Sequence, residues 1–183
     1  MARVNVFLAE GFEEIEALTV VDLLRRVAVD VNTVSITKNT HVTGARKIEV
    51  VADTTIDDVD FASGEMIVLP GGMPGTKNLE ACETLMSQVD DYASSNRYVA
   101  AICAAPTILG HRSLLAGKKA CCYPGMQGEL DGAEVTFDEV TVDDKIITSR
   151  GLGTAVAFAL KLVEILVDEQ AAKELGKAVV YQA

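Results

Sequence analysis

The cysteine at position 103 has the surroundings of a reactive residue. It follows the apolar run of residues 98–102, which reads as a buried β-strand, and it precedes two alanines and Pro106. Because proline favours the first turn of a helix, Cys103 is expected on a sharp strand-to-helix turn. Unpaired N–H groups and the helix dipole at such a turn favour a thiolate, which predicts a lowered thiol pKa and a nucleophilic or oxidisable sulfur. The alternative is a buried structural cysteine that packs as a small apolar side chain.

Glu16 places a carboxyl group on an apolar helix face. The residues that follow Phe12 have helical character, and with Phe12 at 0° on a helical wheel Glu16 falls at about 40°, beside Leu23 at about 20°. Glu14 is expected on the opposite side. Glu13 also falls near the apolar side, but in the first turn, where it is expected to reach water and cap the helix. A carboxyl group among aliphatic side chains should have a raised pKa, and its proton can bond a thiolate or an oxidised sulfur. A partly solvated glutamate is the alternative.

The pair Gly71–Gly72 follows another predicted strand. Glycines let backbone N–H groups come close to a substrate oxygen, and with the N–H group of Ala104 they could form an oxyanion hole. A plain tight turn is the alternative. The sequence Gly-Gly-Met-Pro-Gly lacks the spacing of a dinucleotide-binding loop, and no cofactor is predicted.

Strand-like and helix-like segments alternate along the chain, which predicts βαβ units in a doubly wound, mostly parallel sheet with helices on both faces. In such sheets ligands bind beyond the carboxyl ends of the strands, where Cys103 and Gly71–Gly72 are expected to lie. With no repeat and no linker-like segment, one α/β domain is expected over residues 1–183. Predicted strands cover residues 4–8, 29–36, 48–51, 66–69, 98–102, 119–122, 135–137, 140–142 and 145–148, and predicted helices cover 13–27, 79–93, a run from 106, 153–167 and 169–175.

Composition and charge argue against several classes of function, among them nucleic-acid binding, membrane association and metal binding. The formal net charge of −11 argues against non-specific nucleic-acid binding and against anionic membranes. No apolar segment has the length of a signal sequence or a membrane span, so a cytoplasmic location is expected. The four cysteines lack CxxC spacing, which favours free thiols over disulfides or metal ligands. Cys121 and Cys122 are expected to alternate on a strand, so that at most one faces the site.

Four segments together make the chain resemble the DJ-1/PfpI superfamily, in its DJ-1/YajL/ThiJ-like branch, over essentially its whole length: LAEGFEEIEA (8–17), IVLPGG (67–72), AAICAAP (100–106) and TSRGLGT (148–154). The resemblance implies a flavodoxin-like fold, a homodimer and an easily oxidised cysteine. It implies that Cys103 is the nucleophile and redox centre and that Glu16 is its protonated partner. It also implies that Gly72 and Ala104 donate backbone N–H groups.

The same resemblance implies roles for three arginines. Arg46 matches an arginine that reaches toward the site of a neighbouring subunit, Arg26 matches one near the dimer interface, and Arg150 lies in the segment next to the site. From the sequence alone, Arg46 and Arg150 would be interpreted as surface cations, because arginine side chains are usually exposed.

The chain departs from the family pattern at two positions. Tyr123 stands where many relatives have a histidine beside the cysteine, and tyrosine is a poor base at neutral pH. His41, in a predicted loop, and His111, beyond a helix turn, do not replace that histidine. Leu152 stands where a proline is common.

Two functions follow from the resemblance. One is a glutathione-independent glyoxalase or deglycase, in which Cys103 attacks a small reactive carbonyl or glycated substrate and Glu16 moves the protons. The alternative is a redox-responsive stress protein or chaperone, in which Cys103 is oxidised to a sulfinate held by the proton of Glu16. The missing histidine weakens the enzyme more than the sensor. It also disfavours a peptidase, which needs a Cys–His pair.

Overall fold

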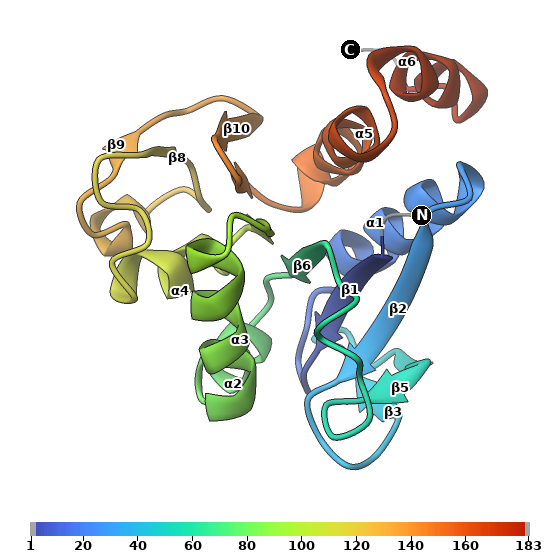
Figure 1. Cartoon of the computed structure of the whole chain (residues 1–183), viewed down its shortest axis with the longest axis vertical. Helices are drawn as coiled ribbons and strands as arrows, with labels where there is room; N and C mark the ends of the chain where they lie inside the picture. The colour runs from blue at the N-terminus through green and yellow to red at the C-terminus, as the bar shows by residue number, and fades with distance from the viewer. Residues whose placement is uncertain (1–2, 182–183) are drawn as a thin grey trace.

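A seven-stranded sheet forms the centre of the computed structural model, which describes residues 3–181 (Figure 1). The strand order is β10-β11-β7-β6-β1-β2-β5, and every neighbouring pair is parallel except β10 with β11. The predicted mostly parallel sheet is therefore confirmed. The strands are β1 (Arg3–Leu8), β2 (Asp30–Ser35), β5 (Thr54–Thr55), β6 (Met66–Leu69), β7 (Tyr98–Ile102), β10 (Val140–Asp143) and β11 (Ile146–Ser149).

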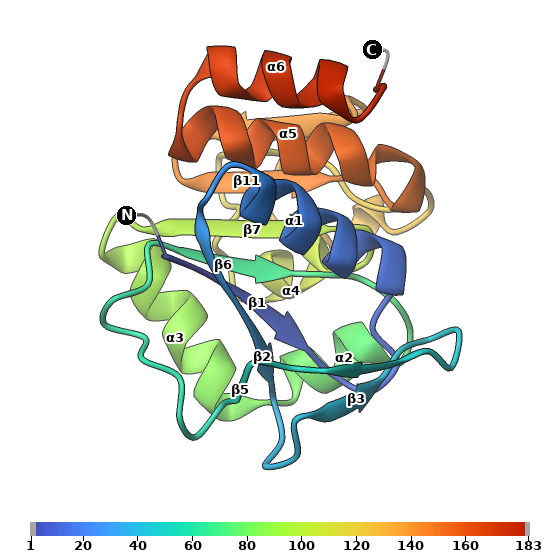
Figure 2. The ribbon, with the colours of Figure 1, turned by 90° about the vertical axis from the view of Figure 1, so that its right-hand side faces the viewer.

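Helices cover both faces of this sheet (Figure 2). One face packs against α1 (Glu14–Arg26) and α5 (Ala155–Leu166), and α6 (Glu169–Ala178) packs on α5. The other face packs against α2 (Gly75–Glu80), α3 (Glu83–Ser94) and α4 (Pro106–His111). The alternation of side chains along each strand produces these two cores. Val6 and Leu8 enter the first core, whereas Phe7 enters the second. The doubly wound α/β architecture is thus confirmed.

The helix predicted over residues 79–93 is in fact two helices, because the chain turns at Ala81 and Cys82 between α2 and α3. Cys82 has an extended backbone with φ −83° and ψ 95°. In one continuous helix, Leu79 and Leu85 would point about 120° apart. The break lets both side chains be fully buried in the same core.

Three predicted strands, those expected over residues 48–51, 119–122 and 135–137, lie outside the main sheet. β4 (Glu49–Val51) pairs antiparallel with β3 (His41–Thr43), so the predicted loop around His41 is wrong. β8 (Lys119–Ala120) pairs with β9 (Glu134–Val135) and ends before Cys121. The predicted alternation of the two adjacent cysteines on a strand is therefore wrong as well.

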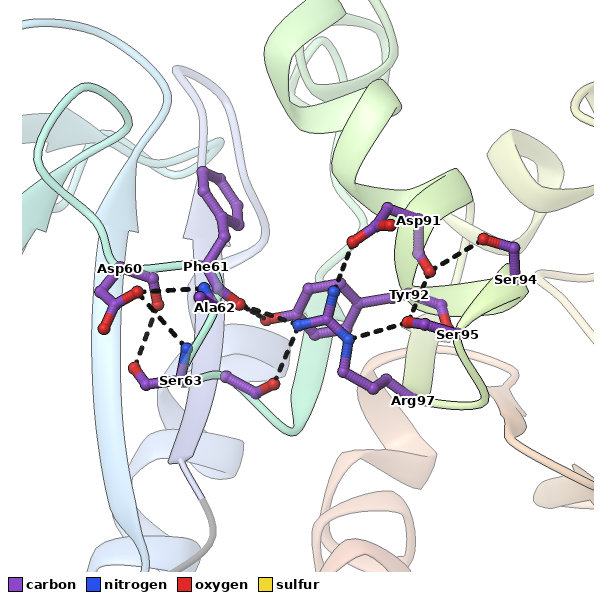
Figure 3. A network of polar contacts seen from close by, with 10 residues as sticks. Asp60, Phe61, Ala62, Ser63, Asp91, Tyr92, Ser94, Ser95 and Arg97 are labelled. Carbon is purple, nitrogen blue, oxygen red and sulfur yellow. Dashed lines mark hydrogen bonds and ion pairs between the residues drawn. The ribbon is translucent and has the colours of Figure 1, made fainter.

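A polar network closes the amino-terminal end of β6 and β7, far from the carboxyl ends of the strands (Figure 3). The Arg97 guanidinium donates to the Phe61 carbonyl at 2.8 Å, pairs with Asp91, and lies 3.5 Å from the centre of the Tyr92 ring. The Tyr92 hydroxyl donates to the same carbonyl at 3.0 Å. These contacts fix the loop before β6 to α3.

Within residues 3–181, none of the helices has both the length and the apolar character that crossing a membrane requires.

Candidate active site

Cys103 lies on a tight turn directly after β7. Its φ of +65° is a left-handed conformation that residues other than glycine rarely adopt. Two backbone hydrogen bonds hold the turn: Cys103 donates to the Ser149 carbonyl at 3.0 Å and accepts from the Tyr123 N–H group at 2.7 Å. Pro106 begins α4 three residues later, as the sequence indicates. The predicted strand-to-helix turn at the cysteine is confirmed.

Glu16 reaches the same place from α1. Its side chain is 1% exposed, and its Oε2 atom accepts the Gly71 N–H group at 2.9 Å. A methyl group added at Gly71 would lie 2.6 Å from Cβ of Cys103 and 2.7 Å from Oε2 of Glu16. Glycine is needed there because the backbone lies directly against both the cysteine and the carboxyl group.

A half-open cavity of about 480 Å³ contains both groups. The backbone N–H groups of Ala104 and Gly72 approach the sulfur and favour its ionised form. Gly72 adopts a φ of +94°, which a side chain would strain. The cavity is lined by Glu13, Glu16, Ala45, Arg46, Gly72, Met73, Cys103, Ala104, Tyr123, Met126 and Leu152.

Burial shifts the acidity of the Cys103 thiol and the Glu16 carboxyl group. It raises the pKa of Glu16 to about 7, against the opposing effect of hydrogen bonds from Cys103 and Gly71. Burial also raises the pKa of Cys103 to about 12, and the charge of the Glu16 carboxylate adds to this rise. The lowered thiol pKa expected from the helix start is therefore wrong, because loss of solvation outweighs the backbone donors. The arrangement favours a thiol whose proton a neighbouring carboxylate can accept.

Removing the carboxylate is expected to lower the pKa of Cys103. In Glu16→Gln the burial remains, but the negative charge beside the sulfur is gone. Thiolate absorbance followed against pH should show a Cys103 midpoint well above that of a free thiol in the wild type and a lower midpoint in the variant. Subtracting the titration of Cys103→Ala isolates this one thiol. A wild-type midpoint below pH 8 would contradict the effect of burial.

The structure brings some of the expected residues into the cavity and leaves others outside it. Arg46 and Tyr123 both line the cavity, and Arg46 lines that of its own chain. Arg150 does not line the cavity, although its neighbour Ser149 accepts the Cys103 N–H group, and its guanidinium is directed to the Phe137 carbonyl at 3.4 Å. Arg26 pairs with Asp22 at the far end of α1. Ten residues of helix place it about 15 Å along the axis from Glu16, so Arg26 is not adjacent to the cavity, and its expected place near a dimer interface stays a prediction.

The other cysteines and the histidines lie apart from the cavity lining. All four cysteines are free thiols, and Cys121 and Cys122 are buried. The Cys121 sulfur contacts Oγ1 of Thr148 at 3.7 Å. His41 pairs with a glutamate on the β3–β4 hairpin, and His111 lies between Glu80 and Glu129. None of the residues lining the cavity within the described chain is a histidine.

Glu13 is a cavity residue that the sequence analysis assigned to capping. It occupies the position before α1 but makes no capping bond with its side chain, which is 8% exposed and lines the cavity. Its N–H group donates to the Gly71 carbonyl at 2.9 Å, which holds it on the cavity side. The spacing of three residues from Glu16 could have revealed this, because such residues share a helix face.

No group of three or more histidine, cysteine, aspartate or glutamate side chains in residues 3–181 is placed to hold a metal ion. The fold and the site together define a doubly wound α/β protein with a cysteine on a strand-to-helix turn and a buried carboxyl group beside it. The DJ-1/PfpI family model matches residues 2–165. The chain belongs to the DJ-1/PfpI family.

Individual relatives agree with this assignment. Protein DJ-1 homolog A of Arabidopsis thaliana is 37% identical over 177 residues, which are 96% of this chain but 45% of that protein, so the chain spans less than half of that relative's length. Glutathione-independent glyoxalase DJR-1.2 of Caenorhabditis elegans is 33% identical over 86% of this chain and 84% of its own length. The structure of oxidized DJ-1 of Toxoplasma gondii has a TM-score of 0.96 at 33% identity and covers 100% of both chains.

Proposed function

We propose that this protein is a cofactor-independent glyoxalase or deglycase that acts on methylglyoxal and similar reactive carbonyl compounds. The observation that carries the proposal is the meeting of the Cys103 sulfur and the Glu16 carboxyl group in one half-open cavity with backbone donors. A pKa of about 7 suits Glu16 to exchanging protons at neutral pH. The similarity to a nematode protein named as a glutathione-independent glyoxalase supports the same activity.

The proposed reaction begins with addition of the Cys103 sulfur to the aldehyde carbon. Glu16 accepts the thiol proton and passes it to the aldehyde oxygen, which gives a hemithioacetal. The N–H groups of Gly72 and Ala104 stabilise the negative charge on that oxygen during the addition. Glu16 then removes the proton from the former aldehyde carbon and delivers it to the neighbouring carbonyl carbon, while the hydroxyl proton of the hemithioacetal moves to the oxygen of that neighbouring carbon. The first carbon is thereby oxidised to a thioester, and the second is reduced to an alcohol.

Water then cleaves the thioester, releasing lactate and regenerating the thiol. The net reaction is methylglyoxal plus one water to lactic acid, so it requires no external oxidant or reductant. Redox balance is internal, because one carbon of the substrate loses the electrons that its neighbour gains.

The assay that tests the proposal is lactate formation from methylglyoxal by the purified protein without glutathione. Wild-type protein should form lactate with multiple turnovers, whereas Cys103→Ser should fall to the rate of the buffer, because a serine hydroxyl is a far weaker nucleophile. Lactate formation by the wild type no faster than by Cys103→Ser would reject the enzyme.

The absence of a histidine among the described cavity residues favours a second candidate, a redox-responsive stress protein or chaperone. A sulfinate on Cys103 needs only donors, and the N–H groups of Gly72 and Ala104 with a protonated Glu16 supply them. Mass spectrometry after mild peroxide treatment should then show two added oxygens on Cys103 alone. Equal oxidation of all four thiols would argue against this role.

The homodimer and the cytoplasmic location expected from the sequence stay predictions. Exposed apolar side chains of α1, of the β3–β4 hairpin and of the segment before α5 support self-association, because a second copy could cover them. These side chains are Ile15, Ile48 and Leu152, which are 50%, 54% and 53% exposed.

A further inference from the structure

Glu14 is a buried carboxyl group that the proposed reaction does not use. The helical wheel places it on the side away from the sheet, yet its side chain is 2% exposed. Its Oε1 atom accepts the Arg46 N–H group at 2.7 Å and the Ile48 N–H group at 3.4 Å. Its Oε2 atom is buried and has no hydrogen-bond partner within residues 3–181. One carboxyl group therefore holds the turn between β3 and β4.

The turn is fitted closely to this carboxyl group. A methyl group added at Gly44 would lie 2.2 Å from Oε1 of Glu14, so the backbone of the turn rests directly on the carboxyl group. Two further hydrogen bonds dock the hairpin beside it: the Ala45 N–H group donates to the Phe12 carbonyl at 2.7 Å, and the Gly11 N–H group donates to the Thr43 carbonyl at 2.8 Å. The turn is thus fixed to the segment that leads into α1.

Arg46, which this turn carries, is the one cationic side chain among the described residues that line the cavity. Its guanidinium makes no ion pair with any residue of the described chain. Glu13 and Glu16 supply negative charge to the same cavity. An unpaired guanidinium at this place can therefore offset the repulsion that an anionic substrate would meet.

We propose that Glu14 is a positioning residue that holds Arg46 at the Cys103 cavity, where its positive charge offsets part of the negative charge of Glu13 and Glu16 and so lets anionic reactive carbonyl compounds reach the sulfur. The nature of the substrate rests on the proposed function. The positioning itself concerns the electrostatic potential at the sulfur and can be tested without any turnover.

Alkylation of Cys103 by two reagents of similar size measures this potential. Iodoacetate is anionic and iodoacetamide is neutral, and both react with the thiolate. Because both rates depend on the same thiolate fraction, their ratio cancels changes in the pKa of Cys103. Peptide mass spectrometry would follow Cys103 separately from the other three cysteines.

Arg46→Met is expected to lower the ratio of iodoacetate to iodoacetamide rates by about fivefold, because it removes one nearby positive charge. Glu14→Ala should lower it nearly as far, and the double variant should lower it no further than Arg46→Met. Glu14→Gln should not lower the ratio, because its amide oxygen can still accept the Arg46 N–H group and the loss of one negative charge acts in the opposite direction.

The direction in which the ratio of iodoacetate to iodoacetamide rates changes distinguishes loss of Arg46 positioning from simple removal of a negative charge. Loss of a carboxylate without movement of Arg46 would raise the iodoacetate ratio, as the control Glu49→Gln on the same hairpin should show. A raised or unchanged ratio in Glu14→Ala would overturn the proposal. Should that variant fail to fold, Gly44→Ala provides the same test from the other partner, since its added methyl group must displace the turn from Glu14. An unchanged ratio in Gly44→Ala would then overturn the proposal.

Discussion

Glu16→Gln is expected to lower the turnover of methylglyoxal by about a thousandfold, the size of effect typical of losing a positioned general acid–base group. Glutamine has the same shape and can still accept the Gly71 N–H group, but it cannot take a proton from the thiol or from substrate carbon. The Michaelis constant should change far less than kcat. Lactate formation measured against methylglyoxal concentration at pH 7 gives both constants.

The control for this experiment is Glu10→Gln, which changes an exposed carboxylate in the loop that precedes α1, the helix that carries Glu16. It should retain turnover within a few-fold of the wild type. In the wild type, kcat should rise with pH near 7, as Glu16 ionises, and this rise should disappear from the residual activity of Glu16→Gln. A loss of less than tenfold in Glu16→Gln would mean that another group moves the protons, and Glu13 would be the first candidate because it lines the same cavity.

The second large effect is on stability, which Glu16 should make dependent on pH. The folded protein raises the pKa of this carboxyl group from 4.5 to about 7, so the folded state holds the proton more tightly than the unfolded chain does. Stability is then unaffected by this group below pH 4.5 and falls as the pH rises from 4.5 to about 7. The shift corresponds to a loss of about 3 kcal/mol in the free energy of unfolding.

Urea unfolding of wild type and Glu16→Gln at a series of pH values between 4 and 8 measures this loss. The variant lacks the titrating group, so its free energy of unfolding relative to that of the wild type should rise by about 3 kcal/mol as the pH rises from 4 to 8. Stopping at pH 8 keeps the comparison below the ordinary thiol pKa of 9.0, above which the raised pKa of Cys103 adds a further loss of stability. The exposed carboxylate of Glu65 provides the matched control, because Glu65→Gln should follow the wild-type profile. Parallel profiles for Glu16→Gln and wild type would show that burial does not raise the pKa of Glu16.

The sequence by itself determined the places of Cys103 and Glu16 and the sheet and helices that carry them. An apolar run ending at Cys103, followed by Pro106, is a local pattern, and it predicts the turn without any knowledge of the neighbours. The place of Glu16 on the buried face follows from helical periodicity, since the sheet is a large partner that any apolar helix face must cover. The alternation of strands and helices predicts the parallel sheet for the same local reason.

The tertiary structure alone decided what surrounds those groups. The pKa of Cys103 depends on how completely the neighbouring segments exclude water from the sulfur. These segments are α1, the Gly71–Gly72 turn and the residues around Tyr123. A pattern along one strand and one helix contains no such information, so the predicted direction was wrong.

Glu14 shows the same limit most clearly. A helical wheel has one buried side, and Glu14 falls on the other side of it. A hairpin whose turn begins 30 residues later in the sequence covers that second side and donates two N–H groups to its carboxyl group. Local periodicity determined which side chains of the helix face the sheet. Only the tertiary structure decided which of the other side chains are also buried, because their burial depends on contacts between segments far apart in the sequence.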